Sequence, residues 1–367
     1  MKRWILAAAA CLMLHGTAAA YSAQAYAVLA AETGVLLDSG NAQTQLPMAS
    51  TTKIMTGLLA AEDAQPERVI SVPAACAGVE GSSMYLKAGE LLPLRDVLYG
   101  LMLCSGNDAA ECIAAVCGGR EAFVAKMNAR AQELGLEQTH FENPSGLDGA
   151  QHYTTAQELA KLTAEALQNP LFAQVVRTKN YTAGGRTMVN HNKLLKLYDD
   201  AIGVKTGFTK TAGRCLVSAA QKNGRTVIAV TLNDGNDWED HMHMLDAAWE
   251  SMTEQTWAQQ GEAAKTISVQ TGTKQTVNAV YAEKLKACVF DGEQTELHID
   301  CIPFVYAPVK EGTVCGQAKI MCGDTVLSQT DLVLGTSVDC DTSQEDTSRL
   351  ERFRQWLDQI RHRKVEE

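Results

Sequence analysis

Three short motifs carry the residue types that nucleophilic chemistry needs, and the first lies in "MASTTKIMTG", residues 48–57. Ser50 and Lys53 are three positions apart, a spacing that places two side chains on one face of a helix. Apolar neighbours disfavour the ammonium form of Lys53 and lower its pKa, so the neutral amine can take the proton of the Ser50 hydroxyl. The alternative interpretation is a serine N-cap followed by a lysine that extends its amine to solvent.

The second motif is Ser105-Gly106-Asn107, whose hydroxyl can relay a proton and whose amide can hold a carbonyl group. The same letters occur at Ser39-Gly40-Asn41, where they follow a predicted hairpin and indicate a plain turn. The later copy joins two helical patterns, "LYGLMLC" and "DAAECIAAV", so only this copy can be held rigidly in a core. We therefore take Ser105 and Asn107 as the candidate functional pair.

The third motif, Lys205-Thr206-Gly207, stands where strand-like sequence resumes after "AIGV". A fixed cation at Lys205 can attract a carboxylate, and Thr206 can donate a hydrogen bond to it. Gly207 has no side chain, so an extended ligand can approach the strand edge closely. Taken alone, the motif is also compatible with a surface turn.

In this order, Ser-x-x-Lys, Ser-x-Asn and Lys-Thr-Gly resemble the active-site motifs of the penicillin-recognising serine acyl-enzymes. The surrounding sequence is similar to that of the D-alanyl-D-alanine carboxypeptidases, the low-molecular-weight penicillin-binding proteins of the bacterial cell wall. The similarity covers residues 26–252 and is carried by stretches such as "LPMASTTKIMTGLLAAE" and "NHNKLLKLYDDAIGVKTGFTKTAGRCLVSAA". The resemblance implies an α/β (α+β) fold, a serine β-lactamase/transpeptidase-like domain with an antiparallel sheet flanked by helices and a helical subdomain.

The resemblance also implies a covalent mechanism on peptidoglycan stem peptides. Ser50 attacks the carbonyl of the terminal D-Ala-D-Ala bond, Lys53 acts as general base, and Ser105 passes the proton to the leaving D-alanine. The backbone N–H groups of Ser50 and Phe208 form the oxyanion hole. Water then hydrolyses the acyl-enzyme, whereas a β-lactam mimics the substrate and traps Ser50. No metal or other cofactor is expected.

For substrate binding, the resemblance implies that Asn107 orients the acyl part and that Lys205 and Thr206 hold the terminal carboxylate beside Gly207. Some relatives place an arginine after the strand "TVIAVTLNDG" to help bind this carboxylate, but this chain has "NDWEDHMHML" there and no arginine. The carboxylate site is therefore expected to rest on Lys205 and Thr206, with Thr209 as a further candidate.

These motifs must be positioned by a sheet built from both ends of the region. The sequence predicts a hairpin at 26–37, a buried helix at 50–62, mostly helical structure from 94 to 171, strands after 201 and a helix at 238–252. Pairing of the early and late strands gives one antiparallel sheet with helices packed on it, in a peptidase domain at 26–255. Ser145, in the loop "NPSGLDG", stands where many relatives have histidine, and we expect little consequence because the loop is structural.

The sequence after residue 262 has a different character. Short strand-like runs separated by Gly and Asp predict a small all-β domain at 262–340, and "DTSQEDTS" at 341–348 is a polar linker. Residues 349–367 predict an arginine-rich amphipathic helix whose apolar face consists of Leu350, Phe353, Trp356, Leu357 and Ile360. Such a helix can lie on an anionic membrane surface, and the alternative is a helix packed on its own protein or on a partner.

Residues 1–20 have the pattern of an export signal. Lys2 and Arg3 precede an apolar stretch at 4–14, and Ala18-Ala19-Ala20 supplies a cleavage site, with a second at Ala25. The apolar stretch is short for a membrane span, which disfavours an uncleaved anchor. The protein is therefore expected to act outside the cytoplasm, in the cell envelope, peripheral on the outer face of the cytoplasmic membrane.

Composition and missing motifs argue against several other classes of protein. The formal charge of −11 on 367 residues disfavours a nucleic-acid partner. The eight histidines include no H-E-x-x-H zinc motif, and the G-x-S-x-G elbow of other serine hydrolases is absent. A class A β-lactamase would have S-D-N as its second motif and a glutamate for the deacylating water, and we find neither. The eleven cysteines include no C-x-x-C pair and need not form a disulfide framework.

Two alternatives to a carboxypeptidase remain. A DD-endopeptidase of the same family would cut cross-links instead of pentapeptide ends, but a membrane-bound tail that holds the enzyme near new wall favours the carboxypeptidase. A non-catalytic wall-binding protein is disfavoured because all the motif residues are intact. The expected function is removal of the terminal D-alanine from pentapeptide stems, in cell wall biogenesis and cell shape.

Overall fold

Two compact units make up the chain in the computed structural model, which describes residues 21–341 and 350–357. The first unit contains 39–220, 228–245 and the described residues up to Val28, and the second contains 29–38, 221–227 and the described residues from Asp246 onwards. The predicted export signal, the predicted linker from residue 342 onwards and the end of the chain from residue 358 lie outside the described residues.

The central sheet has five strands, in the order β2 (Leu36–Gly40), β1 (Ala25–Ala30), β9 (Arg225–Leu232), β8 (Gly213–Lys222) and β7 (Ala201–Thr209). The early hairpin thus shares a sheet with the late strands, which confirms the predicted arrangement. The β8–β9 hairpin turns at Asn223 and Gly224, whose φ angles of 52° and 76° suit an Asn-Gly turn. Every residue of β9 is buried, whereas β7 is an edge strand that can pair with an extended peptide.

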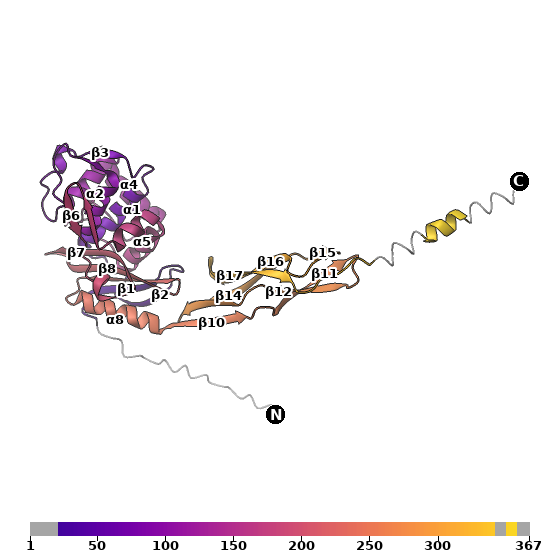
Figure 1. The fold of residues 1–367 in the computed structure, drawn as a ribbon. Coiled ribbons are helices and arrows are strands. Elements are labelled where there is room, and N and C mark those ends of the chain that lie inside the picture. The colour runs from indigo at the N-terminus through magenta and orange to yellow at the C-terminus, as the bar shows by residue number, and fades with distance from the viewer. Residues whose placement is uncertain (1–20, 342–349, 358–367) are drawn as a thin grey trace, which may run out of the picture. The chain divides into compact units, whose positions relative to one another are not determined.

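Seven α-helices lie between β2 and β7 in the described part of the chain. They are α1 (Lys53–Ala61), α2 (Leu94–Leu103), α3 (Asn107–Val116), α4 (Arg120–Glu133), α5 (Ala156–Gln168), α6 (Pro170–Arg177) and α7 (Leu194–Leu197). Figure 1 shows α1, α2, α4 and α5 on one side of the sheet and α8 (Asp237–Glu250) on the other. All nine residues of α1 are buried because α2, α3, α5 and α6 pack around it. Lys53 therefore begins a helix that has no face toward solvent.

Local signals fix where the helices beside α1 begin. The Thr155 side chain caps α5 by accepting a hydrogen bond from Glu158 N, and Asn169 caps α6, whose first residue is Pro170. Gly203 then lets β7 lie close to α6, since a Cβ atom on it would be 3.0 Å from a methyl group of Val176. The edge strand is thus seated directly against the helical layer.

Two small two-stranded sheets within the helical region were not predicted. β3 (Val69–Ser71) pairs with β4 (Leu91–Pro93), and β5 (Asn180–Ala183) pairs with β6 (Arg186–Val189). Strands of three or four residues are too short to show a clear alternation of apolar and polar positions. Their pairing was therefore not visible in the sequence.

The second unit contains two further sheets and a core of its own. One sheet has the order β14 (Thr295–Cys301), β16 (Val314–Cys322), β17 (Thr325–Leu334), β12 (Thr276–Tyr281), β11 (Ala263–Gln270) and β15 (Phe304–Tyr306), and the other pairs β10 (Met252–Ala258) with β13 (Leu285–Phe290). Alternating residues such as Ile267, Val269, Val277 and Ala279 are buried in this core. The predicted all-β fold is confirmed. The unit also includes β10, which lies before residue 262, because β10 pairs with β13.

The described part of the C-terminal segment, residues 350–357, is helical. Leu350, Phe353 and Trp356 are each 54% exposed, and Leu357 is 39% exposed. Ile360, the last residue of the predicted apolar face, lies outside the described residues. None of the helices in the described ranges is long and apolar enough to cross a bilayer.

Candidate active site

Ser50 and Lys53 meet at the start of α1. Ser50 lies in a 3-10 turn, Ala49–Thr52, that runs directly into the helix, and Lys53 is its first α-helical residue. The Lys53 side chain is completely buried, and its Nζ atom lies 2.9 Å from Ser50 Oγ. The three-residue spacing therefore brings amine and hydroxyl together, and the alternative of a solvent-extended lysine is wrong.

Two further oxygen atoms surround the Lys53 amine. Nζ donates hydrogen bonds to Asn107 Oδ1, at 2.8 Å, and to the backbone carbonyl oxygen of Ser145. A neutral amine has two N–H groups and one lone pair. If the two N–H groups point to Asn107 and Ser145, the lone pair faces the Ser50 hydroxyl, which is the arrangement that a general base needs.

Burial is also what tunes the basicity of this amine. Loss of hydration is the main cause that lowers the pKa of Lys53 well below its usual value, and the positive charge of Lys205 lowers it further. The carboxylates of Asp108 and Glu111 oppose this shift more weakly. The neutral form of Lys53 is therefore accessible without strongly basic conditions.

Ser105 occupies the connection between α2 and α3, where it faces the third motif. Its φ angle of 58° lies in the left-handed region, which is costly for a serine. Lys205 Nζ donates to Ser105 Oγ at 3.0 Å and to the carbonyl oxygen of Thr206 at 2.7 Å. Asn107, the first residue of α3, donates from Nδ2 to Glu80 O at 2.7 Å. Hydrogen bonds therefore hold both polar side chains of the second motif, Ser105 and Asn107.

Lys205 is nearly as deeply buried as Lys53, with 1% of its surface exposed. Burial lowers the pKa of Lys205 to about 7, against the weaker opposing effect of Cys104. Lys205 is also not among the residues that line the cavity described below. We expected Lys205 to face a substrate carboxylate, but its amine instead donates a hydrogen bond to Ser105.

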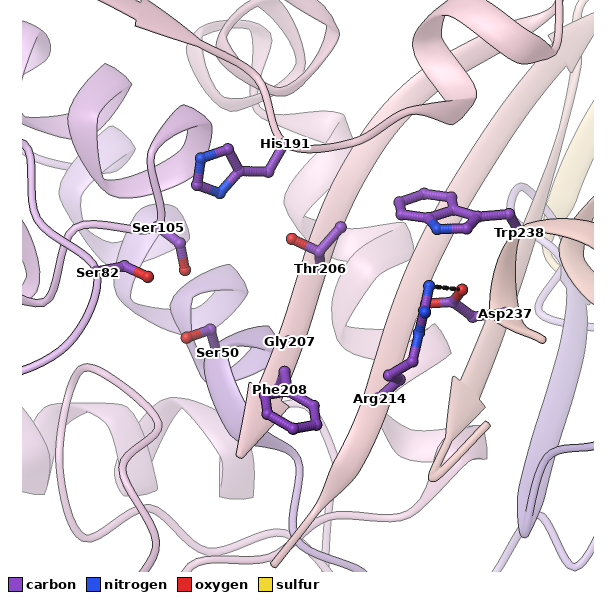
Figure 2. A pocket seen from close by; sticks show the side chains of 10 residues that line it. All are labelled: Ser50, Ser82, Ser105, His191, Thr206, Gly207, Phe208, Arg214, Asp237 and Trp238. Atoms are coloured by element: carbon purple, nitrogen blue, oxygen red, sulfur yellow. Dashed lines mark hydrogen bonds and ion pairs between the residues drawn. The ribbon is translucent and has the colours of Figure 1, made fainter. Parts of the chain in front are cut away.

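A cavity of about 500 Å³ opens beside Ser50. Five of the predicted site residues line it: Ser50, Ser105, Thr206, Gly207 and Phe208. Sequence analysis did not predict the other five: Ser82, His191, Arg214, Asp237 and Trp238. Figure 2 shows the three serines on one side, Thr206 next to them, and the Arg214, Asp237 and Trp238 side chains on the other. The cavity therefore brings together residues from all three motifs.

Gly207 lets the edge strand approach the turn that carries Ser50. A Cβ atom on Gly207 would lie 3.0 Å from Ser50 N and 3.1 Å from Ala49 Cβ, closer than ordinary contacts. The segments that contain Ser50 and Phe208 are therefore in direct contact. Their N–H groups are the two that the sequence analysis assigned to an oxyanion hole.

Arg214 is the cation that the sequence analysis missed. It lies on β8, directly opposite Phe208 of β7, and forms an ion pair with Asp237 in which Nε is 3.1 Å from Oδ2. Asp237 and Trp238 begin α8 and line the cavity. The segment after β9 therefore reaches the cavity, but with an aspartate and a tryptophan in place of the arginine of some relatives. The register of β7 against β8 was the missing information, since cross-strand partners share a face of a sheet.

Two further expectations met a different outcome. Thr209 does not line the cavity, and its hydroxyl donates to Asp148 Oδ1 at 2.7 Å. The Ser145 side chain bonds to Asn143, as expected of a structural loop, but its backbone carbonyl contacts Lys53. No sequence signal marks that contact, because every residue has a carbonyl group.

Among the described residues, no group of His, Cys, Asp and Glu side chains could hold a metal ion.

Comparison with protein families gives two matches along the chain. Residues 14–236 match the peptidase family described as D-alanyl-D-alanine carboxypeptidase, which is more than half of the chain. Residues 253–339 match the C-terminal domain of penicillin-binding protein 5. The two matches follow one another in the same order as the predicted peptidase and β domains.

Individual relatives are similar over most of their own length. The chain is 29% identical over 327 residues to the D-alanyl-D-alanine carboxypeptidase DacF of Bacillus subtilis, with 84% of each chain covered. It is 39% identical to a D-alanyl-D-alanine carboxypeptidase of Streptomyces sp., over 54% of this chain and 77% of the relative. Among solved structures, the carboxypeptidase DacD of Francisella tularensis has a TM-score of 0.62 and 25% identity, with 88% of this chain and 95% of that chain covered. Penicillin-binding protein 5 of Haemophilus influenzae, at 22% identity and a TM-score of 0.64, covers 88% and 99% and shows the shared fold.

Proposed function

The chain belongs to the D-alanyl-D-alanine carboxypeptidase family, and from this premise we propose how its own residues remove the terminal D-alanine of a stem peptide. It is a serine peptidase of the penicillin-binding type. The observation that carries the proposal is the 2.9 Å contact between the buried Lys53 amine and Ser50 Oγ beside a cavity.

In the first half of the reaction, Ser50 Oγ attacks the carbonyl carbon of the terminal D-Ala-D-Ala bond while Lys53 takes its proton. The N–H groups of Ser50 and Phe208 stabilise the negative oxygen of the tetrahedral intermediate. Ser105, hydrogen-bonded to Lys205, delivers a proton to the leaving amine as the C–N bond breaks. The products of this half are free D-alanine and an ester on Ser50.

In the second half, water attacks the ester and Ser50 regains its proton. Asn107 orients the acyl part throughout, with its amide held by Lys53 and Glu80. Thr206 and Gly207 present the strand edge to the substrate, and Thr206 donates a hydrogen bond to its terminal carboxylate. A β-lactam undergoes the same attack, but its leaving group remains tethered to the acyl-enzyme, which keeps Ser50 blocked.

We further propose that the protein is exported and that its signal is removed after Ala20. The contacts of the next residues support this site over the one at Ala25. Ser22 N donates to Asp240 Oδ2 at 2.7 Å, and Gln24 N donates to Leu232 O at 3.1 Å. Cleavage after Ala25 would remove these residues and the first residue of β1. The exported enzyme trims pentapeptide stems in the cell envelope and thereby influences cell shape.

The division of the chain is part of the same proposal. A peptidase domain at 26–255 is followed by a β domain at 262–340, a linker at 341–348 and a helix at 349–367 that lies on the membrane surface. The two family matches support the first two parts, and the exposed apolar residues at 350–357 support the last.

Release of D-alanine from a peptide ending in Lys-D-Ala-D-Ala tests this function. We expect release by the mature protein and a loss of at least about 1,000-fold in Ser50→Ala, since the nucleophile is removed. Covalent labelling with a fluorescent penicillin, followed by mapping of the modified residue, is the parallel measurement. Labelling of Ser50 without D-alanine release would favour the endopeptidase, and the absence of both would contradict a catalytic role.

A further inference from the structure

The cavity contains one cation that none of the three motifs supplies, Arg214. Its side chain is 43% exposed, whereas Lys205, the residue expected to bind the substrate carboxylate, is 1% exposed and bonded to Ser105. Among the described residues that line the cavity, Arg214 is the only arginine or lysine. Arg214 is therefore the more exposed of the two cations at the cavity.

The sheet directs Arg214 toward the face on which Thr206 lies. Arg214 is opposite Phe208 in the antiparallel register, and Leu216 is opposite Thr206. Cross-strand partners share a face, as do residues two apart along a strand, so Thr206, Phe208 and Arg214 project from the same face. Figure 2 shows the guanidinium of Arg214 between Thr206 and Asp237.

Asp237 holds the guanidinium without using all of it. The carboxylate accepts hydrogen bonds from Nε and Nη2, and its side chain is only 6% exposed. No described contact engages Nη1, so its two N–H groups remain available to a ligand. Asp237, which also lines the cavity, thus fixes the guanidinium of Arg214 and leaves Nη1 free to bind a carboxylate.

We propose that Arg214, together with Thr206, binds the terminal carboxylate of the substrate, and that Lys205 instead serves Ser105. This inference rests on the proposed function, because the carboxylate belongs to the D-alanine that leaves. Arg214 then supplies from β8 the charge that some relatives supply with an arginine after β9. The carboxylate of a penicillin occupies the same place.

The test uses two substrates and a matched control. A peptide ending in Lys-D-Ala-D-Ala is compared with its C-terminal amide in the wild type, Arg214→Gln and Arg95→Gln. Arg95 is also a partly exposed, ion-paired arginine, at 38% exposure, but it does not line the cavity. We expect Arg214→Gln to lower kcat/KM for the free acid about 10- to 100-fold and to leave that for the amide within about twofold. Arg95→Gln should change neither value.

Three results would overturn the inference. An equal loss on both substrates would mean that Arg214 only holds α8 through Asp237, and no loss on either would mean that it has no role. Failure of the wild type to release D-alanine and to react with penicillin would instead remove the proposed function, and this inference with it.

A second measurement needs no variant. Arginine stays protonated across the working range, whereas the pKa of Lys205 is about 7. We expect KM for the free acid to change less than about twofold between pH 6 and 9, because the binding charge does not titrate. A KM that rises as the pH passes through about 7 would assign the carboxylate to Lys205.

Discussion

Lys53 and Lys205 are both buried, and each places its amine against a serine of the cavity. Burial disfavours the ammonium form of both lysines. The positive charge of Lys205 further disfavours the ammonium form of Lys53. Two like charges in one dry region tend to share a single proton. Burial and the charge of Lys205 thus both favour the neutral form of Lys53, which is the form that a general base needs.

Replacement of Lys53 by arginine tests this assignment at the residue scale. Lys53→Arg keeps a long side chain, but the guanidinium stays charged and cannot accept the proton of Ser50. We expect the rate of Ser50 acylation by benzylpenicillin to fall about 100- to 10,000-fold, the range for loss of a general base. In the wild type, kcat/KM should fall as the pH drops through the pKa of Lys53, since only the neutral amine accepts the proton.

Stopped-flow acylation and a melting curve together measure this effect. The melting curve separates loss of the base from loss of the fold, because Lys53 is completely buried. A folded Lys53→Arg variant that acylates at a rate close to wild type would show that Lys53 is not the base.

At the scale of elements, the segment before β1 holds the loop that leads into α8. Ser22 donates through its hydroxyl to Asp234 and, at 3.0 Å, to Asp240, and it accepts a hydrogen bond from Asn236 N at 2.9 Å. The same loop continues into Asp237, which fixes Arg214. The first residues after the predicted signal therefore help to position one wall of the cavity.

Ser22→Ala should lower the free energy of unfolding by about 1–2 kcal/mol at pH 7, with Ser71→Ala, an exposed serine, as the control. Burial raises the pKa of Asp234 above its usual 3.8, and the Ser22 hydroxyl opposes this rise. A carboxyl with a raised pKa in the folded state costs stability as the pH rises above its unfolded value. The loss in Ser22→Ala should therefore shrink as the pH falls from 7 toward 4 and Asp234 takes up a proton.

Urea unfolding of both variants at pH 7 and pH 4 provides the measurement. A loss of the same size at both pH values would show that Asp234 is not the cause. An unchanged midpoint at pH 7 would show that the N-terminal segment does not stabilise the loop.

At the scale of the whole molecule, the C-terminal helix joins apolar and basic side chains on a segment that the catalytic chemistry does not use. Leu350, Phe353 and Trp356 are half exposed, and arginines are interspersed with them in the sequence. Burial of these side chains at a bilayer interface, aided by attraction of the arginines to anionic lipid, favours surface binding.

Truncation after Asp341 should abolish binding to vesicles that contain anionic phospholipid and leave D-alanine release from a soluble peptide unchanged. Binding of the full mature chain should weaken as salt is raised, because part of the attraction is electrostatic. Vesicle co-sedimentation measures both effects, with neutral-lipid vesicles as the control. Vesicle binding that survives the truncation would place the membrane contact elsewhere in the chain.

The sequence by itself determined those features whose cause is local. Ser50 and Lys53 face each other because they are three positions apart on a helical turn, and Asn223-Gly224 forms a hairpin because both residues tolerate positive φ. The alternation of helical and strand-like segments was enough to predict the sheet and the β domain, since each pattern reports how one element is buried.

Only the tertiary structure decided which cation faces the cavity. Lys205 belongs to a recognisable motif but is buried against Ser105, while Arg214 belongs to no motif and reaches the cavity through the register of two strands. The carbonyl of Ser145 contacts Lys53 for a similar reason, because the path of a loop brings it there. Exposure, strand register and backbone contacts depend on segments far apart in the chain, and a local sequence pattern carries no information about them.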